Sequence, residues 1–123
     1  MTDLRVRGLR GATTVAADEP DAIFDATSEL LHALMERNGL QPSQVISAVF
    51  TVTPDLTSDF PARAARVVGW GDVPLLCTTE IPVKGALPHC IRALLHVERD
   101  AAAPPLRHVY LREAVVLRPD LPA

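Results

Sequence analysis

The sequence predicts a single α+β domain over residues 1–123, with two helices packed on one β-sheet. Three observations support this fold class. Residues 18–39 repeat apolar side chains at helical spacing, and residues 45–53 are rich in the β-branched residues typical of a buried strand. The complete order is strand–helix–strand–helix–strand–strand–strand, and no repeat, linker or charge run divides it.

The opening segment LRVRGLRGATTV, residues 4–15, alternates in the manner of a β-strand. The alternation gives it two faces, with Leu4, Val6 and Gly8 on one and Arg5, Arg7 and Leu9 on the other. Continued by one step, it places Arg10 on the apolar side with Leu4 and Val6, although a guanidinium cannot lose its charge. Either the strand ends before Arg10 or an anionic group lies beside it.

An amphipathic helix follows over about residues 18–39. Pro20 suits a first helical turn, and the acidic residues before it favour the positive end of the helix dipole. Asn38 and Gly39 form a typical C-terminal stop. The apolar stripe expected to face the sheet consists of Ile23, Thr27, Leu30 and Leu34, widened by Phe24, Leu31 and Met35.

The second half of the chain is predicted to hold shorter elements. Residues 45–53 form a buried strand, residues 58–71 a short helix, and residues 73–81 a third strand. The segment HCIRALLHVERD, residues 89–100, fits a helix or a strand, and its alternation favours the strand. Residues 107–117 are read as a last strand that leads into a short C-terminal tail.

Composition excludes several classes of function. A formal charge of −3 and only five aromatic residues argue against a nucleic-acid partner. No apolar run approaches the roughly 20 residues of a membrane span, and no signal segment precedes the first strand, so we expect a soluble, cytoplasmic protein. Cys77 and Cys90 lack metal-ligand spacing and the four histidines are scattered, so no metal site is expected.

The basic residues are eleven arginines and one lysine. A GC-rich genome explains the high number of arginines at least as well as a functional role does, so the positions of the arginines are more informative than their number. Arg10 lies near a strand end, Arg92 within an apolar strand, and Arg63 and Arg66 on one face of the short helix, while Arg118 follows the last strand. Together they suggest a pocket for a multiply charged carboxylate.

Nucleophilic catalysis has little support in the residues. Cys77 has no visible histidine partner and is more simply read as a packed thiol. His108 beside Tyr110 forms a possible acid–base pair or a simple packing contact, and Glu80 and Lys84 are catalytic candidates or solvated charges. No serine-hydrolase elbow, Walker loop or dinucleotide fingerprint is present.

Four stretches together carry a resemblance to a known family: RGLRGATTV, TPDLTSDFPARAAR, GWGDVPLLCTTEIPVKGALPHCIRALLHV and RHVYLREAVVLRPDL. In this order and spacing they resemble the monofunctional chorismate mutases of the small trimeric AroH class, over about residues 4–122. The resemblance implies rearrangement of chorismate to prephenate on the route to phenylalanine and tyrosine, without cofactor or metal. It also implies a mixed sheet with two helices, and a homotrimer resembling a pseudo-α/β-barrel with active sites between subunits.

Residue roles follow from the same resemblance. Arg92 of CIR is similar to the cation beside the ether oxygen, whose negative charge grows in the transition state. Arg10 is expected to hold a carboxylate and to approach the ether side. Glu80 of CTTE is expected to accept the ring hydroxyl, with Cys77 on the same wall, and Tyr110 of HVYL to contact a carboxylate.

Further contacts are expected from the rest of the motif set. The short helix of the neighbouring subunit is expected to contribute Phe60, Ala62, Arg63 and Arg66, and Leu76 lies beside Cys77. Leu117 and Arg118 belong to the tail, from about residue 117, that closes over the site.

This sequence departs from the family pattern in three places: Arg63 replaces a common lysine, and Ala86 and Pro88 stand where small or basic residues are common. Two alternatives remain open beside the mutase. One is a trimeric small-carboxylate-binding protein without chemistry, and the other is an enzyme on a similar scaffold, such as an imine deaminase.

Overall fold

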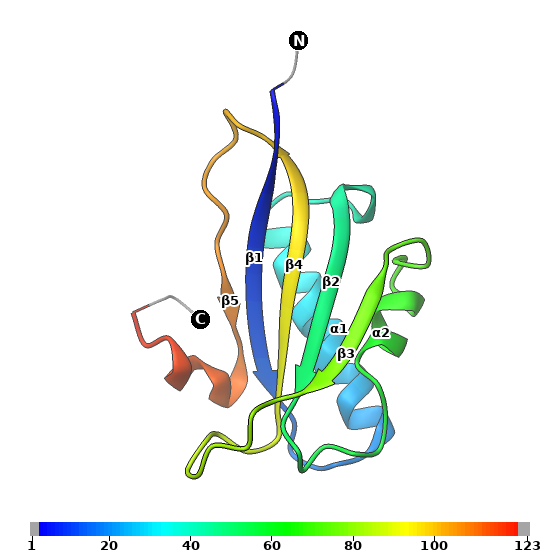
Figure 1. Ribbon diagram of the computed structural model, residues 1–123, viewed down its shortest axis with the longest axis vertical. Coiled ribbons are helices and arrows are strands. Elements are labelled where there is room, and N and C mark those ends of the chain that lie inside the picture. Colours follow the sequence, from blue (N-terminus) through cyan, green and yellow to red (C-terminus); the bar gives the residue numbers. More distant parts are fainter. Residues whose placement is uncertain (1–2, 121–123) are drawn as a thin grey trace.

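The computed structural model describes residues 3–120. Within this range the chain folds into a five-stranded mixed sheet with two α-helices and two short 3₁₀ helices (Figure 1). The elements are β1 (Leu4–Thr14), α1 (Pro20–Arg37), η1 (Pro42–Gln44), β2 (Val45–Val52), α2 (Ala62–Val67), β3 (Leu75–Thr79), β4 (Cys90–Asp100), β5 (Val109–Tyr110) and η2 (Arg112–Leu117). The predicted α+β class is confirmed.

The strand order is β3-β2-β4-β1-β5. The long central strand β4 pairs antiparallel with β1 and β2, while β5 joins β1 and β3 joins β2 in parallel. Segments 45–52 and 90–100, which are far apart in sequence, therefore lie side by side. Alternating burial along β4 settles the ambiguity of residues 89–100 in favour of the predicted strand.

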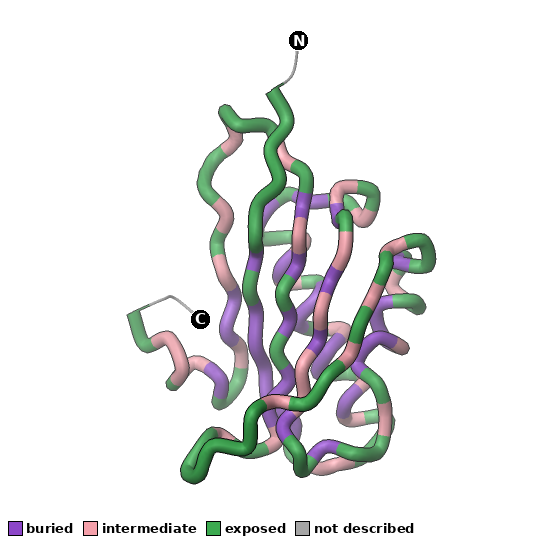
Figure 2. The backbone as a smooth tube through the Cα atoms, in the orientation of Figure 1, coloured by how far each residue is buried: buried purple, intermediate pink, exposed green. Residues whose placement is uncertain are grey.

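Both α-helices lie on one face of the sheet, behind it in Figure 1. We call this the covered face; its core side chains include Leu9, Phe50, Ala93 and Leu95. The opposite side, the open face, carries the intervening residues of the same strands; neither α-helix lies over it, and η2 packs only at its edge, against Ala12 and Tyr110. Figure 2 shows how exposed and buried positions alternate along the strands.

Helix α1 packs on the sheet where β1 carries a glycine. A Cβ atom at Gly11 would lie 3.0 Å from methyl carbons of both Leu30 and Leu34, closer than ordinary packing allows. The predicted stripe is otherwise as expected, because Ile23, Thr27, Leu30 and Leu34 are all completely buried. The helix ends as predicted at Asn38, with Gly39 in the left-handed region at φ +60°.

The predicted alternation is confirmed, because Arg10 lies on the same face as Leu4 and Val6, but that face is not the core of the chain. The strand runs through Arg10 to Thr14, but its buried face is that of Leu9 and Gly11. Leu4 and Val6 lie on the open face, where they are 51% and 58% exposed. Arg10 shares that face, so its charge stays in contact with solvent and no burial cost arises.

The predicted last strand, residues 107–117, was also wrong over most of its length. Strand β5 contains only Val109 and Tyr110, and the 3₁₀ helix η2 replaces the remainder. Arg112 has φ +52°, which ends the extended backbone, and its guanidinium contacts Glu29 at 3.3 Å. Runs of valine resemble a strand locally, whereas this turn depends on partners distant in the chain.

Among residues 3–120, no helix combines the length and apolar character needed to cross a membrane. The predicted tail falls partly in the described range: Leu117 and Arg118 are described, and residues 121–123 lie outside it.

Candidate active site

The open face carries an ion pair between two of the predicted catalytic residues. Arg92 lies near the start of the central strand β4, and Glu80 follows directly after β3. The Nε atom of Arg92 is 3.0 Å from Oε1 of Glu80. The side chains are 46% and 24% exposed, so the pair is accessible to a ligand.

Strand β2 lies between these two residues and supplies a third group. Thr51 is opposite Arg92 in the β2–β4 register, and its hydroxyl donates to Oε1 of Glu80 at 2.5 Å. The backbone N–H of Glu80 donates to the carbonyl oxygen of Val52 at 2.8 Å. One segment of β2 therefore fixes both the backbone and the carboxylate of Glu80.

Arg10 and Tyr110 complete this cluster. Arg10 faces Leu94 in the β1–β4 register, and Tyr110 pairs with Ala12 in β1. Together with Arg92, Glu80 and Thr51 they line one cavity of about 230 Å³. Arg10, Arg92, Glu80 and Tyr110, predicted from separated motifs, are thus brought together on one face. We refer to this group, with Thr51, as the arginine cluster.

His108, directly before the edge strand β5, contacts the neighbouring strand β1 beside the cluster. Its Nδ1 atom accepts the backbone N–H of Arg10 at 3.0 Å, so the proton of the neutral imidazole must reside on Nε2. Burial, and then the charges of Arg10 and Arg118, lower the pKa of His108 below its usual value. The ring is therefore kept neutral and links β5 to β1; it is not paired with Tyr110 as an acid–base couple.

The predicted tail residues lie close to Tyr110. Leu117 packs against the buried cluster of Ala12, Tyr110 and Ala114. Arg118 makes an ion pair with Asp120 at 2.9 Å, and this contact, with the nearby Tyr110, raises the pKa of its guanidinium.

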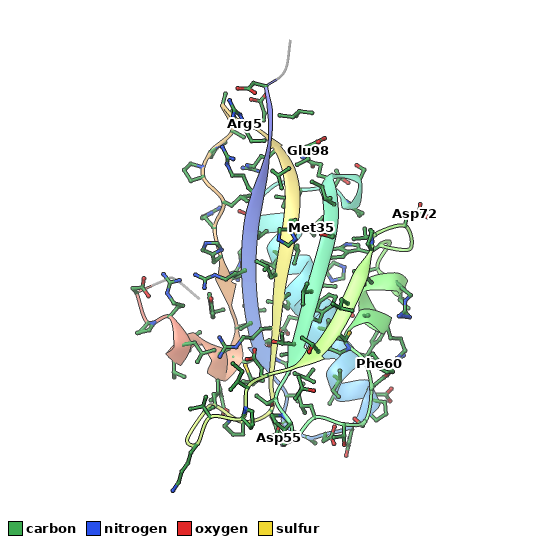
Figure 3. All side chains as sticks on the ribbon, in the orientation of Figure 1. Arg5, Met35, Asp55, Phe60, Asp72 and Glu98 are labelled. Carbon is green, nitrogen blue, oxygen red and sulfur yellow. The ribbon has the colours of Figure 1, made fainter. Side chains whose placement is uncertain are left out.

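The start of β4 is held by a network around Asp55. Both carboxylate oxygens accept the backbone N–H of His89, at 3.0 and 3.2 Å, and the Thr53 hydroxyl donates to Oδ1 while accepting the N–H of Cys90. His89 has φ +51°, an uncommon backbone state that these bonds stabilise. Partial burial opposes ionisation, but the hydrogen bonds from Thr53 and His89 and the His89 charge outweigh it and lower the pKa of Asp55. Figure 3 shows Asp55 at the end of the sheet opposite to Arg5 and Glu98.

Cys77 is not part of the arginine cluster within one chain. It pairs with Phe50 and packs against the core of the covered face, whereas Glu80 reaches the open face. The expectation that Cys77 and Glu80 share a wall therefore fails for a single chain, because strand residues an odd number of positions apart point to opposite faces. Cys77 instead lines a cavity of about 310 Å³ together with Phe60, which is 65% exposed.

The other residues expected from the short helix have different surroundings. Arg66 is exposed, and Leu76 lies on the open face at 63% exposure. Arg63 is engaged within its own chain: its Nε lies 2.5 Å from Asp59, and its guanidinium stacks 4.6 Å from the ring centre of Phe24. Ala62 is 4% exposed, and its methyl group belongs to the core of its own chain.

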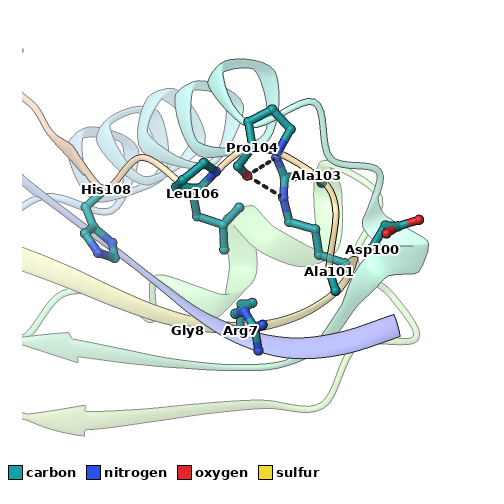
Figure 4. Close-up of a pocket in the computed structure, with 10 residues that line it drawn as sticks. Arg7, Gly8, Asp100, Ala101, Ala103, Pro104, Leu106 and His108 are labelled. Carbon is teal, nitrogen blue, oxygen red and sulfur yellow. Dashed lines mark hydrogen bonds between the residues drawn. The ribbon is translucent and has the colours of Figure 1, made fainter. Parts of the chain in front are cut away.

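A further cavity of about 350 Å³ lies at the far end of β1 and β4 (Figure 4). It is lined by Arg7, whose Nη1 donates to the Val6 carbonyl, and by Arg99, whose Nε and Nη2 donate to the Pro104 carbonyl and whose Nη1 donates to the Asn38 carbonyl. The Arg99 donors hold the 101–107 loop in place, and the cavity contains none of the predicted catalytic residues, so we do not take it as the candidate site.

Two members of the site were missed by the sequence reasoning. Thr51 was seen only as part of a buried strand, and His108 was considered for acid–base chemistry and not as an acceptor for Arg10. Alternation along β2 places Ser47, Val49 and Thr51 on one face and was a usable signal for Thr51. The His108 contact spans 98 positions and had no local signal.

Comparison with known proteins agrees with this geometry. Residues 6–121 match the family model described as chorismate mutase type I. The chain is 56% identical to a protein named chorismate mutase AroH from Thermus thermophilus, over 94% of this chain and 96% of that protein. It is 44% identical to the chorismate mutase AroH of Bacillus subtilis strain 168, over 96% and 94% of the two chains.

Among solved structures, a chorismate mutase from Clostridium thermocellum superposes with a TM-score of 0.84 at 44% identity, covering 89% of this chain and 98% of that one. The match to the family model spans most of the chain, and the sequence and structural likenesses agree with it. The chain belongs to the chorismate mutase type I family.

Proposed function

We propose that this protein is an isomerase that rearranges chorismate to prephenate within a homotrimer, at sites shared between neighbouring subunits. The observation that carries the proposal is the Arg92–Glu80 pair on an accessible face, with Arg10 and Tyr110 in the same cavity. Family membership supports the reaction, and the geometry supports the roles of the individual residues.

The reaction needs charge stabilisation rather than a nucleophile. Chorismate is a dianion, and its ether C–O bond breaks as a new C–C bond forms within the same molecule. Negative charge grows on the ether oxygen before the bond is fully broken, so a fixed cation there binds the transition state more tightly than the substrate. We assign this role to Arg92, whose guanidinium makes its closest carboxylate contact through Nε and retains its terminal amino groups for the substrate.

The remaining groups hold the substrate in its compact reactive form, which removes conformational freedom before the reaction. Glu80 accepts the ring hydroxyl, and Arg10 and Tyr110 bind carboxylate oxygens from the adjacent strands. Leu117 and Arg118 lie next to Tyr110 and form the edge that closes over the ligand.

A second subunit is needed to complete the site. The arginine cluster lies on an exposed face of the chain, where Arg92 and Glu80 border two cavities, one of about 230 Å³ and one of about 500 Å³. Phe60 and Cys77 line a separate cavity of the same chain, and Arg66 is exposed on α2. We infer that the neighbour presents these residues, together with Leu76 and the Ala62–Arg63 backbone, to the arginine cluster.

The open face also favours association. Its exposed apolar side chains include Leu4, Val6, Leu76 and Leu94, which is unusual for a surface that remains in water. Covering this face by neighbouring subunits would bury the apolar side chains and enclose the arginine cluster. Two described cysteines are free thiols, in keeping with work in the reducing cytoplasm.

The first test is direct turnover. The purified protein is mixed with chorismate, the loss of chorismate absorbance is followed, and the product is identified by acid conversion to phenylpyruvate. We expect rapid loss without added cofactor. Saturable binding of chorismate by calorimetry without turnover would overturn the enzyme assignment in favour of a carboxylate-binding protein. Absence of both binding and turnover would contradict the assignment of chorismate as the substrate.

The shared site is tested by mixing inactive variants. Arg92→Ala and Arg66→Ala are purified separately, unfolded, combined and refolded, so that some sites join an intact Arg92 to an intact Arg66 from the neighbour. We expect activity to reappear in this mixture. The control mixture of Arg92→Ala with Glu80→Gln places both defects in the same half-site and should stay inactive; equal behaviour of the two mixtures would contradict a shared site.

A further inference from the structure

The carboxylate of Glu80 is held asymmetrically. Its Oε1 atom receives the Thr51 hydroxyl at 2.5 Å and lies 3.0 Å from Nε of Arg92. Among residues 3–120, no group donates a hydrogen bond to Oε2. One oxygen is thus occupied by protein groups from two strands, and the other is free to accept a proton donor from a ligand.

Carboxylates and guanidinium groups that approach freely tend to form two parallel hydrogen bonds. Such a pairing would occupy Oε2 of Glu80 and a terminal nitrogen of Arg92, the two groups that the proposed reaction requires for substrate. The Thr51 hydroxyl binds Oε1 from the β2 side and favours the single-contact arrangement.

The position of Thr51 is determined by strand register. It lies opposite Arg92 on β4 and opposite Thr78 on β3, so it is fixed between the strand that carries Arg92 and the strand that leads to Glu80. As a β-branched residue in a strand interior it has few side-chain rotamers, which suits a fixed donor.

We propose that Thr51 is a positioning residue for the mutase reaction: its hydroxyl holds Glu80 in single contact with Arg92, which leaves Oε2 for the ring hydroxyl and the terminal nitrogens of Arg92 for the ether oxygen. This inference rests on the proposed function. Thr51 borders the same cavity, but its hydroxyl is engaged by Oε1 of Glu80, so we assign its effect to the positions of Glu80 and Arg92.

The test compares Thr51→Val, which keeps the branched shape without the donor, with Thr51→Ser, which keeps the donor. We expect Thr51→Val to lower kcat about tenfold, the size of effect that follows loss of a hydrogen bond to a charged group, with a smaller change in KM. Thr51→Ser should remain within about threefold of the unsubstituted protein. Thermal unfolding and oligomeric state are measured for both, and Thr51→Ala replaces Thr51→Val if the latter does not fold.

Ser47 provides a matched control. It lies on the same strand and face as Thr51, and its hydroxyl also contacts a side chain beyond its own strand, at 3.1 Å from Nδ1 of His96 on β4. Ser47→Ala removes a comparable cross-strand bond away from Glu80, so kcat should be unchanged.

A double-mutant cycle separates positioning from general structural loss. In a Glu80→Gln background, the further change Thr51→Val should alter kcat by less than about twofold, because the group that it positions is already altered. The inference would be overturned if Thr51→Val had a normal kcat, or if its effect on kcat were fully additive with that of Glu80→Gln. In both cases the unsubstituted protein would still convert chorismate, so the proposed function would stand. Absence of that turnover would instead overturn the proposed function.

Discussion

The covered and open faces of the sheet are built from the same strands but have opposite surroundings. On β4, Leu95 is completely buried beneath the helices, whereas the adjacent Leu94 is 37% exposed. On β3 and β1 the contrast is larger, since Leu76 and Val6 are more than half exposed. Alternation alone therefore does not tell which side of a strand is the core.

This difference separates stability from chemistry. Apolar burial under α1 stabilises the single chain, and the charged groups stand on the other face, where water and ligands reach them. Arg92 illustrates the benefit: its strand is anchored by the buried Ile91 and Ala93, and its guanidinium stays partly in solvent. Substitutions on the open face should therefore mainly lower activity, whereas substitutions on the covered face should mainly lower the free energy of unfolding.

The largest effect is expected for Arg92→Ala on the open face. Loss of a charged donor that acts in the transition state should cost on the order of 3–4 kcal/mol, or roughly 10²–10³ in kcat, or more. The free energy of unfolding should change little, because the side chain is 46% exposed. Steady-state kinetics and denaturant unfolding measure the two quantities.

Arg92→Lys should recover only part of that loss, because lysine lacks the planar fork of donors. If Arg92→Ala retained near-normal kcat and raised only KM, the arginine would be a binding group and the proposed mechanism would be wrong.

The opposite result is expected for Leu30→Ala on the covered face. Leu30 is fully buried and faces Gly11, so its truncation should lower the free energy of unfolding by about 2–5 kcal/mol. Protein that remains folded should keep its kcat within about twofold, since the cavity forms on the far side of the sheet from Arg92. Urea unfolding monitored by circular dichroism measures the free energy of unfolding. A loss of kcat without a loss of stability would contradict the separation of stability and chemistry between the two faces.

A smaller effect is expected when the apolar part of the open face is made charged. Val6 is opposite Glu98, so Val6→Asp places two like charges across the strand pair and discourages burial of this face. Association should weaken by about tenfold or more, equivalent to roughly 1.4 kcal/mol. Sedimentation at several concentrations measures it; Val6→Thr is the uncharged control, and unchanged association would place the interface elsewhere.

The smallest effect concerns pH. The pKa of His108 is lower in the folded chain than its ordinary value of 6.5, so below about pH 6.5 the unfolded chain takes up a proton that the folded chain resists. The free energy of unfolding should therefore fall as pH decreases through this window and level off below the folded pKa. His108→Asn keeps an acceptor for the Arg10 N–H without a titrating ring, and its stability profile should be flatter there; an identical slope in both proteins would exclude His108 as the cause.

The local pattern was sufficient for much of the fold. The helical stripe of Ile23, Thr27, Leu30 and Leu34, its stop at Asn38 and the alternation of residues 90–100 were all predicted, because periodicity and capping depend on near neighbours. It failed at residues 111–117, where Arg112 adopts a positive φ beside a distant glutamate.

Sequence by itself determined the α+β class, the helix and central strands, and, through its resemblance to a family, the arginines and Glu80 as site candidates. Only the tertiary structure decided which face of each strand is open, that Cys77 and Glu80 point in opposite directions, and that Thr51 and His108 hold members of the site. The physical reason is that side-chain direction within a strand is set locally, whereas the identity of the facing partner depends on register between strands 29 to 98 residues apart.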